Sequence, residues 1–396
     1  MKDIPSRPVS RTRTEIAGAR RIVVKVGTNV VMREDGAVAI GRLYGLVESI
    51  ANLRIDKRDL LVVSSGAVGL GAQRLTLTGK PGDIATKQAC AAVGQSRLMS
   101  IYEEGFGRLG LVSAQVLLTE DDFSDRRRYL NLRATLARLL ELGAIPILNE
   151  NDTVSTVELE PLPGGAANRR PVFGDNDKLS ALVASKMEAD LLILLSDVDG
   201  LYTANPAKDQ TATLVSLVTE MTPEIERTAD GGGLRGRGGM ATKLEAARIA
   251  MGSGTAVLIA NGRTPGVLDR IFSGEPIGTL FLPGDHLSSR KRWIAWASAV
   301  SGRIVVNDGA RKAILERKAS LLPAGVVSLE GSFERGEVAA LVGPDGVEFA
   351  RGIANYSKTE ASQLRGLHSK NIGQLVAKRG RDALVSRENI VVEIRK

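Results

Sequence analysis

The sequence predicts an α/β protein whose mainly parallel sheet is sandwiched by helices, followed by a small β-barrel-like domain. Fully apolar runs of strand length alternate with amphipathic helical stretches, a pattern typical of a parallel sheet covered on both faces. Near residue 300 the pattern changes to short β-like runs separated by Gly, Pro and Asp, which favours a barrel or sandwich. The expected strands are 22–26, 60–63, 145–148, 191–195 and 256–260, then 304–306, 325–329, 338–342 and 347–350; expected helices include 41–53, 129–142, 178–186 and 242–251.

These patterns divide the chain into four segments. Residues 1–19 are polar, with two prolines and scattered arginines, and predict a flexible N-terminal arm. Residues 20–283 form the expected α/β domain. Residues 284–299, which include a basic cluster, are the expected linker, and 300–396 form the small β domain with a basic tail.

The composition narrows the class of protein. Hydrophobic residues make up 43% and charged residues 25%, ordinary values for a soluble globular protein. No apolar run approaches the roughly 18 residues of a membrane span, and the polar start has no apolar signal region, so we expect a cytoplasmic protein. The single cysteine, Cys90, excludes an internal disulfide framework. His286 and His368 are far apart, so the chemistry must depend on Lys, Asp, Asn, Ser and Gly.

The positive charge is concentrated near the C-terminus. Residues 1–289 contain 34 Lys and Arg against 34 Asp and Glu, whereas residues 290–396 contain 19 against 11. The whole net charge of +8 therefore lies in the last part of the chain. This asymmetry indicates either an acidic partner such as nucleic acid or a solvated basic surface.

Polar and small residues follow the predicted strands, where ligands of parallel α/β sheets collect. Lys25 lies inside the first strand, followed by Gly27 and Thr28, which would aim a positive charge at a close ligand; the alternative is an edge-strand lysine facing water. The second strand ends in residues 64–67 (Ser-Ser-Gly-Ala). These would offer N–H groups to a carboxylate or phosphate at a helix N-terminus, or form a plain turn.

Amides and carboxylates cluster at two further places. Residues 149–152 (Asn-Glu-Asn-Asp) follow a buried strand, and 174–177 (Gly-Asp-Asn-Asp) open a helix. Such residues suit the binding of a small polar substrate, particularly its amino group, although they also cap turns and helices. Glycines recur between 231 and 239, where they would let backbone N–H groups approach phosphates, and Lys243 adds a second positive charge. A glycine-rich loop without a role is the alternative.

Three common signatures of nucleotide enzymes are absent. The chain has no Walker A pattern, no H-R-D or D-F-G triplet, and no G-x-G-x-x-G after the first strand. Two lysines, a glycine-rich loop and a polar pocket favour phosphoryl transfer, which depends on positioning and charge neutralisation. A carboxylate acceptor fits the scarcity of histidine, because it is already ionised at neutral pH and needs no general base.

Taken together and in order, these motifs resemble those of the glutamate 5-kinase family of amino acid kinases. The likeness covers about residues 20–283. Residues 308–310, 320–326 and 335–338 resemble the PUA domain that bacterial members carry and that related amino acid kinases generally lack. The motifs that carry the resemblance are 24–28, 64–67, 91–95 (Ala-Ala-Val-Gly-Gln), 149–152, 174–181, 196–202 and 238–243.

The resemblance implies ATP-dependent phosphorylation of the side-chain carboxylate of L-glutamate to L-glutamyl 5-phosphate, the first step of proline biosynthesis, with Mg²⁺ accompanying ATP. Lys25 and Lys243 would neutralise the transferred phosphoryl group, and Asp177 would position them. Glutamate would be bound by Ser65, Asp152 and Asn176. ATP would be bound by Lys25, Ser196, Asp197, Arg237, Gly238, Gly239, Met240, Ala241, Thr242 and Lys243.

The resemblance also implies a homo-oligomer inhibited by proline. One departure concerns the stretch between 152 and 174, which is longer than the family pattern leads us to expect. We therefore predict a mobile loop over 155–172 that affects inhibition more than turnover.

Two other functions stay open from the sequence. One is a kinase for another small carboxylate, such as acetylglutamate or aspartate. The other is an RNA-binding or RNA-modifying protein, suggested by the basic C-terminal domain and its PUA resemblance. The few aromatic residues of that domain provide little surface for base stacking, and RNA is kept only as an unproven partner. A purely structural or oligomer-regulating C-terminal domain is a third interpretation.

Overall fold

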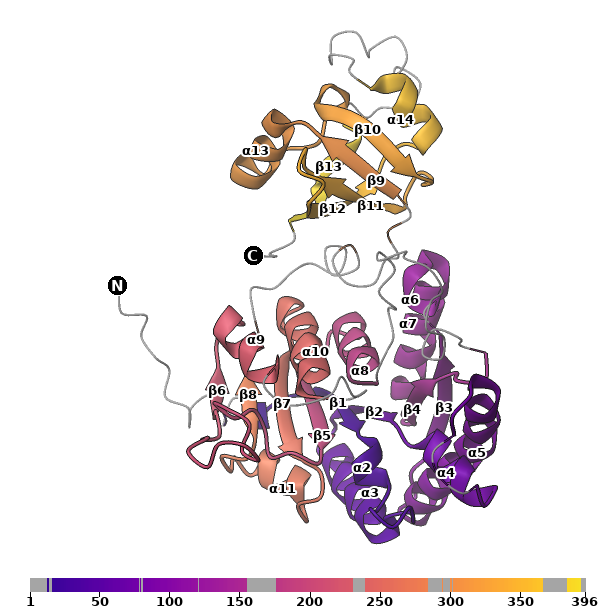
Figure 1. Cartoon of the computed structure of the whole chain (residues 1–396). Helices are drawn as coiled ribbons and strands as arrows, with labels where there is room; N and C mark the ends of the chain where they lie inside the picture. The colour runs from indigo at the N-terminus through magenta and orange to yellow at the C-terminus, as the bar shows by residue number, and fades with distance from the viewer. Residues whose placement is uncertain are drawn as a thin grey trace. The chain divides into compact units, whose positions relative to one another are not determined.

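The computed structural model describes residue 13 and residues 16–77, 79, 81–119, 121–154, 176–230, 239–283, 294, 300, 302–365 and 383–392. The chain divides into two compact units, Met1–His286 and Leu287–Lys396. Each unit has its own sheet and its own hydrophobic core (Figure 1). Within the described residues, no helix combines the length and the apolar character needed to cross a membrane.

An eight-stranded sheet forms the centre of the first unit. Its strands are β1 (Arg21–Val26), β2 (Asp59–Ser64), β3 (Ser113–Leu118), β4 (Ile145–Glu150), β5 (Leu191–Ser196), β6 (Leu217–Val218), β7 (Ala256–Asn261) and β8 (Thr279–Phe281). They lie in the order β3-β4-β2-β1-β5-β7-β8-β6. The strands from β3 to β7 in this order are parallel, while β8 is antiparallel to β7 and parallel to β6. The predicted mainly parallel sheet is thus confirmed.

Helices cover both faces of this sheet (Figure 1). They are α2 (Thr28–Val31), α3 (Ile40–Ile55), α4 (Ala67–Arg74), α5 (Ile84–Arg108), α6 (Asp121–Ser124), α7 (Arg126–Glu141), α8 (Asn176–Lys186), α9 (Pro223–Asp230), α10 (Met240–Gly252) and α11 (Val267–Phe272). Successive side chains of a strand point to opposite faces. Ile22, Val24 and Val26 therefore share one core with α3, α5 and α11, and Lys25 emerges on the other face, where α8 contacts β1.

The strands that the sequence did not reveal lie at the two ends of the sheet. β3 is an edge strand in which Gln115 and Leu117 are exposed, so it lacks the continuous apolar run of a strand buried on both faces. β6 has two residues and β8 has three, and they are too short to produce a periodic pattern. The apolar-run criterion therefore finds the central strands and misses the marginal ones.

The N-terminal arm predicted over residues 1–19 is wrong at its C-terminal end. The side chains of Ile16 and Ala19 belong to the same hydrophobic core as Ile22, Val24 and Val26, and Arg13 is also buried. The N–H group of Ala19 donates to the carbonyl oxygen of Ile16 at 3.0 Å, and this turn brings both side chains to the same core. Residues 16–19 are therefore part of the α/β unit.

The second unit contains a five-stranded sheet. Its strands are β9 (Gly302–Val306), β10 (Val326–Gly331), β11 (Val338–Val342), β12 (Glu348–Ala354) and β13 (Val385–Val392), accompanied by α13 (Asp308–Arg317) and α14 (Lys358–Leu364). The order is β10-β9-β11-β12-β13, and every pair except β9 and β11 is antiparallel. The expected small β domain is confirmed, with β13 as a strand that the sequence did not indicate. Apart from Ile294, the predicted linker 284–299 lies outside the described residues.

Candidate active site

Two buried lysines contact one buried aspartate near the carboxyl ends of the parallel strands. Lys25 Nζ lies 2.6 Å from Asp177 Oδ1, and Lys243 Nζ lies 3.2 Å from Asp177 Oδ2. The Asp177 side chain is fully buried, and those of Lys25 and Lys243 are 6% and 4% exposed. Thr242 Oγ1 also donates to Asp177 Oδ2, at 3.2 Å. Two ammonium groups thus approach one carboxylate from opposite oxygens, which concentrates positive charge near the ends of these strands.

The topology explains why these three residues meet. β1 lies between β2 and β5, so Lys25 belongs to a central strand and the edge-strand interpretation is excluded. Its side chain emerges on the face where α8 packs, and α8 packs in turn against α10. Asp177 and Lys243 lie in the first turns of these two helices. Residues far apart in the sequence therefore converge above a single strand.

Asp177 is ionised in this environment. Burial by itself would raise the pKa of the carboxyl group, but the ammonium groups of Lys25 and Lys243 outweigh burial and hold the pKa below its ordinary value. A carboxylate with a lowered pKa that is bound to two lysines is a poor proton acceptor at neutral pH. Its chemistry is therefore electrostatic: it orients the lysines.

A chain of side-chain hydrogen bonds runs from the end of β2 to α5. Asn176 Nδ2 donates to Ser65 Oγ at 2.8 Å and to Asn149 Oδ1 at 2.9 Å. Asn149 Nδ2 donates in turn to Gln95 Oε1 at 2.8 Å. Gln95 is 8% exposed, and its Nε2 has no hydrogen-bond partner among the described residues. A buried amide donor without a partner is unusual in a folded protein and indicates a missing ligand or water.

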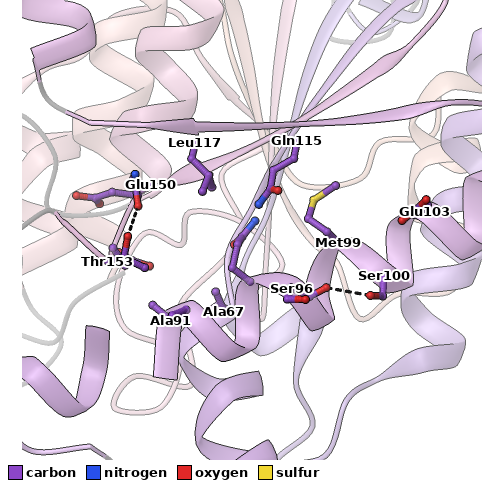
Figure 2. Close-up of a pocket in the computed structure, with 14 residues that line it drawn as sticks. Ala67, Ala91, Ser96, Met99, Ser100, Glu103, Gln115, Leu117, Glu150 and Thr153 are labelled. Carbon is purple, nitrogen blue, oxygen red and sulfur yellow. Dashed lines mark hydrogen bonds between the residues drawn. The ribbon is translucent and has the colours of Figure 1, made fainter. Parts of the chain in front are cut away.

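Gln95 lines a cavity of about 460 Å³ between α5, the edge strand β3 and the end of β4. Figure 2 shows Leu117 and Gln115 on one side of this cavity and Ala67 and Ala91 on the opposite side. The predicted substrate-binding residue Asp152 also lines it. The complete lining is Ala67, Ala91, Ala92, Gln95, Ser96, Met99, Ser100, Glu103, Gln115, Leu117, Glu150, Asn151, Asp152 and Thr153.

The position of Gln95 depends on the close approach of α4 and α5. A Cβ atom at Gly94 would lie 1.7 Å from the carbonyl oxygen of Ala67, and one at Gly71 would lie 1.8 Å from that of Cys90. Only glycine allows two helix backbones to approach this closely. The crossing places Gln95 beside the N-terminal end of α4. This end of α4 follows Ser64, the last residue of β2, and Ser65.

Ser196 and Asp197 lie at the end of β5, next to the end of β1. Asn29 Nδ2 donates to Asp197 Oδ2 at 2.7 Å, and Ser196 Oγ donates to Asp197 Oδ1 at 3.1 Å. Partial burial would raise the pKa of Asp197, but the hydrogen bond from Asn29, helped by that from Ser196, lowers it overall. Asp197 therefore presents a charged, partly exposed carboxylate at this strand end.

The predicted nucleotide-binding segment is described only from Gly239 onward. Gly239 precedes α10, whose first residues are Met240, Ala241 and Thr242. Arg237 and Gly238 lie outside the described residues, as does the predicted loop 155–172. A second cavity of about 550 Å³ lies between α9 and the chain that follows β5. It is lined by Thr203, Ala204, Asn205, Lys208, Asp209, Glu224, Arg227 and Thr228.

The predicted site residues thus fall into three groups. Lys25, Asp177 and Lys243 form the ion-paired group; Ser65 and Asn176 are hydrogen-bonded to each other, and Asp152 lines the first cavity. Ser196 and Asp197 form the third group, at the end of β5. Asn149 confirms the expectation that the segment 149–152 contributes polar groups here, whereas Gln95 and Asn29 are site residues that the sequence patterns did not single out for a role, although Gln95 belongs to the motif 91–95.

Comparisons with known proteins identify two family matches, close relatives and a similar solved structure. The amino acid kinase family matches residues 20–261, and the PUA domain matches residues 302–376. The chain is 46% identical to the glutamate 5-kinase of Moorella thermoacetica, covering 96% of this chain and 98% of that protein, and 48% identical to the glutamate 5-kinase of Gloeobacter violaceus, covering 93% and 98%. A UMP kinase structure from Bacillus anthracis is similar at a TM-score of 0.45 and 18% identity, covering 67% of this chain and 96% of that one.

Proposed function

The chain belongs to the glutamate 5-kinase family of amino acid kinases, and from this we propose that it transfers the γ-phosphoryl group of ATP to the side-chain carboxylate of L-glutamate. The products are ADP and L-glutamyl 5-phosphate, the first intermediate of proline biosynthesis from glutamate. The observation that carries the proposal is the pair of buried lysines held by Asp177.

Lys25 and Lys243 act on the phosphoryl group during transfer. A carboxylate oxygen of glutamate attacks the γ-phosphorus, and the bond to the β,γ-bridging oxygen breaks as ADP leaves. Negative charge spreads over the transferred oxygens, and two preorganised ammonium groups stabilise it. Asp177 is already ionised and bound to both lysines, so it positions them and takes no proton. The attacking carboxylate is itself ionised at neutral pH, so no general base is needed.

Glutamate occupies the first cavity in this proposal. Asp152 offers a carboxylate to its ammonium group, while Ser65 and Asn176 bind its polar groups near the end of β2. Gln95 supplies an N–H donor to a glutamate carboxylate, which satisfies the amide that has no partner among the described residues. The motif match and the cavity lining support this arrangement.

ATP lies on the β5 and α10 side. Ser196 and Asp197, with the segment 237–243, bind ATP, and the cavity beside α9 is adjacent to the chain leaving this strand end. Among the described residues, no group of three or more His, Cys, Asp or Glu side chains is arranged to hold a metal ion. Mg²⁺ bound with ATP would be held largely by the phosphates, as suits an ion that keeps much of its hydration, and would supply charge neutralisation there.

Regulation by proline and homo-oligomerisation are part of the same proposal. Proline shares the α-carboxylate and an ammonium group with glutamate but has no side-chain carboxylate to phosphorylate, so its binding in the glutamate cavity would block turnover.

The test is a coupled measurement of ADP release with trapping of the acyl phosphate by hydroxylamine. Glutamate, aspartate and N-acetylglutamate are compared in the presence of Mg·ATP, with and without proline. Trapped product from glutamate alone, suppressed by proline, is the expected result. Product from another carboxylate would change the assigned substrate and leave the assignment as a kinase unchanged. No product from any of the three would contradict the proposal.

A further inference from the structure

Among the described residues, the hydrogen bonds of a buried arginine near the N-terminus all run from its two Nη atoms to backbone carbonyl groups. Arg13 is 2% exposed, and its Nη2 donates to Ser216 O at 3.1 Å and to Gly278 O at 2.9 Å. Its Nη1 donates to the carbonyl oxygen of Ile277. Burial lowers the pKa of Arg13. A buried cation costs free energy that neutral carbonyls offset only in part, so stability alone does not account for this arginine.

The three carbonyl groups belong to the chain entering two neighbouring strands. Ser216 directly precedes β6, and Ile277 and Gly278 precede β8. β6 and β8 are short, and they are the last two strands at this end of the sheet (Figure 1). Arg13 therefore links the starts of two strands, which pair with each other through only two residues of each strand.

Residues at the starts of both strands are hydrogen-bonded to the backbone of one residue, Leu201. The Leu201 N–H donates to Thr279 Oγ1 at 2.8 Å, at the start of β8. The Leu201 carbonyl accepts the N–H of Val215 at 2.8 Å, just before β6. Leu201 is itself 1% exposed. Two short paths of covalent and hydrogen bonds thus connect the Arg13 guanidinium to the same backbone position.

Leu201 belongs to the segment that carries Asp197. This segment leaves β5 at Ser196, and Asp199 within it accepts a hydrogen bond from Asn261 Nδ2 at 2.9 Å. Fixing Leu201 therefore fixes one end of a six-residue stretch whose other end is in the candidate nucleotide site. Arg13 is held in turn by residues 16–19, since Ile16 and Ala19 are buried and Arg58 Nη2 donates to Ala17 O at 2.9 Å.

We propose that Arg13 is a positioning residue for nucleotide binding, acting through β6, β8 and Leu201 on the segment 196–201. This inference rests on the proposed function, which places ATP at that segment. Arg13 touches no reacting atom in this scheme, and its effect is expected on the affinity for ATP and not on the glutamate cavity, which lies at the opposite end of the sheet beside β3.

Arg13→Met and Arg13→Ala provide the test in the full-length chain. We expect KM for ATP to rise about fivefold to tenfold, with KM for glutamate and kcat within about twofold of wild type. Methylguanidinium added to Arg13→Ala should lower KM for ATP again by filling the site between the three carbonyls, and should leave wild type unchanged. Unchanged KM for ATP, or equal changes in both KM values, would overturn the proposal.

Thr279→Val and Arg54→Met are the matched variants. Thr279→Val removes the hydroxyl that holds Leu201 and should reproduce the ATP-specific effect without touching Arg13. Arg54 also donates to two backbone carbonyls, those of Arg58 and Leu140, away from the β6 and β8 end of the sheet. Arg54→Met should therefore leave KM for ATP unchanged, and an increase equal to that of Arg13→Met would count against the inference.

Hydrogen exchange keeps the inference separate from the proposed activity. Peptides covering residues 197–203 should exchange faster in Arg13→Met and Thr279→Val, whereas Arg54→Met should match wild type. If wild type phosphorylates nothing, the proposed function fails, and this exchange pattern still decides whether Arg13 holds the segment. If Arg13→Met does not fold, Arg13→Lys, which keeps the charge but loses the planar fork, takes its place in the same measurements.

Discussion

Replacement of Asp177 by asparagine removes the negative charge between two buried ammonium groups and keeps the size of the side chain. Lys25 and Lys243 approach opposite oxygens of this carboxylate at 2.6 and 3.2 Å, in a place where Asp177 has no exposure to solvent. Removing one partner of a buried ion pair costs about 3–5 kcal/mol, because the other charge stays in a poorly solvated environment. Since two charges stay behind here, we expect the free energy of unfolding to fall by at least ~3 kcal/mol.

The same substitution should also slow phosphoryl transfer. Loss of one preorganised electrostatic contact in an active site typically lowers kcat by about 10²–10³-fold, and Asp177→Asn disturbs both lysines together. Mg·ATP should restore part of the lost stability, because phosphate oxygens would supply negative charge beside the same ammonium groups.

Urea unfolding with and without Mg·ATP measures the first effect, and hydroxylamine trapping of the acyl phosphate measures the second. Asp190→Asn is the control, because that carboxylate is exposed and accepts the backbone N–H groups of Arg20 and Arg21. It should lose only about 1 kcal/mol and keep wild-type turnover. An Asp177→Asn protein that unfolds at the wild-type urea concentration and turns over within about twofold of wild type would refute the reasoning.

Four further outcomes are expected. The ionised Asp177 stabilises the folded protein fully above the ordinary carboxyl pKa of about 3.9, and this stability is lost as the pH falls through the lower pKa that Asp177 has in the folded protein. The free energies of unfolding of wild type and Asp177→Asn should therefore converge at low pH in acid unfolding measurements. Lys25→Met and Lys243→Met should each lower kcat by about 10²–10³-fold while the fold stays intact by circular dichroism, although each loses some stability because Asp177 loses one of its two buried partners; wild-type turnover in either would contradict its role. Gln95→Leu should raise KM for glutamate about tenfold and leave KM for ATP unchanged in initial-rate kinetics. Gly94→Ala should destabilise the protein by about 1–3 kcal/mol or more in thermal unfolding, because its Cβ meets the backbone of α4, whereas Gly107→Ala, on the same helix with open space around it, should not.

The central part of the fold is predictable from sequence because its physical signal is local. Strands buried on both faces must be apolar throughout, and β1, β2, β4, β5 and β7 therefore stand out as uninterrupted runs. Lys25 is conspicuous for the same reason, since a lysine within such a run requires a partner. The edge strands β3, β6 and β8 have no such requirement, and their pairing depends on tertiary contacts that the local sequence does not encode.

The candidate site was predictable where its residues follow strands or begin helices. Asp177 and Lys243 lie in the first turns of helices, and their motifs mark them, although their shared contact with Lys25 depends on how α8 and α10 pack. Gln95 is different, because it lies in the middle of a 25-residue helix, where a glutamine is ordinarily a surface residue. Only the backbone contact between Gly94 and Ala67 makes it part of the cavity. Arg13 was assigned to a flexible arm because its carbonyl partners lie more than 200 residues away in sequence.

The hydrogen bonds among the amide side chains between β2 and α5 all run in the same donor-to-acceptor direction. Each amide in the row from Asn176 through Asn149 to Gln95 gives its NH₂ group to the oxygen of the next member. The orientations of Asn176, Asn149 and Gln95 are therefore consistent with one another, and the NH₂ group of Gln95 ends the row. An incoming carboxylate fits this polarity, whereas an ammonium group would require every amide in the row to rotate. A set of uncharged side chains can in this way favour the carboxylate end of a zwitterion beside Gln95.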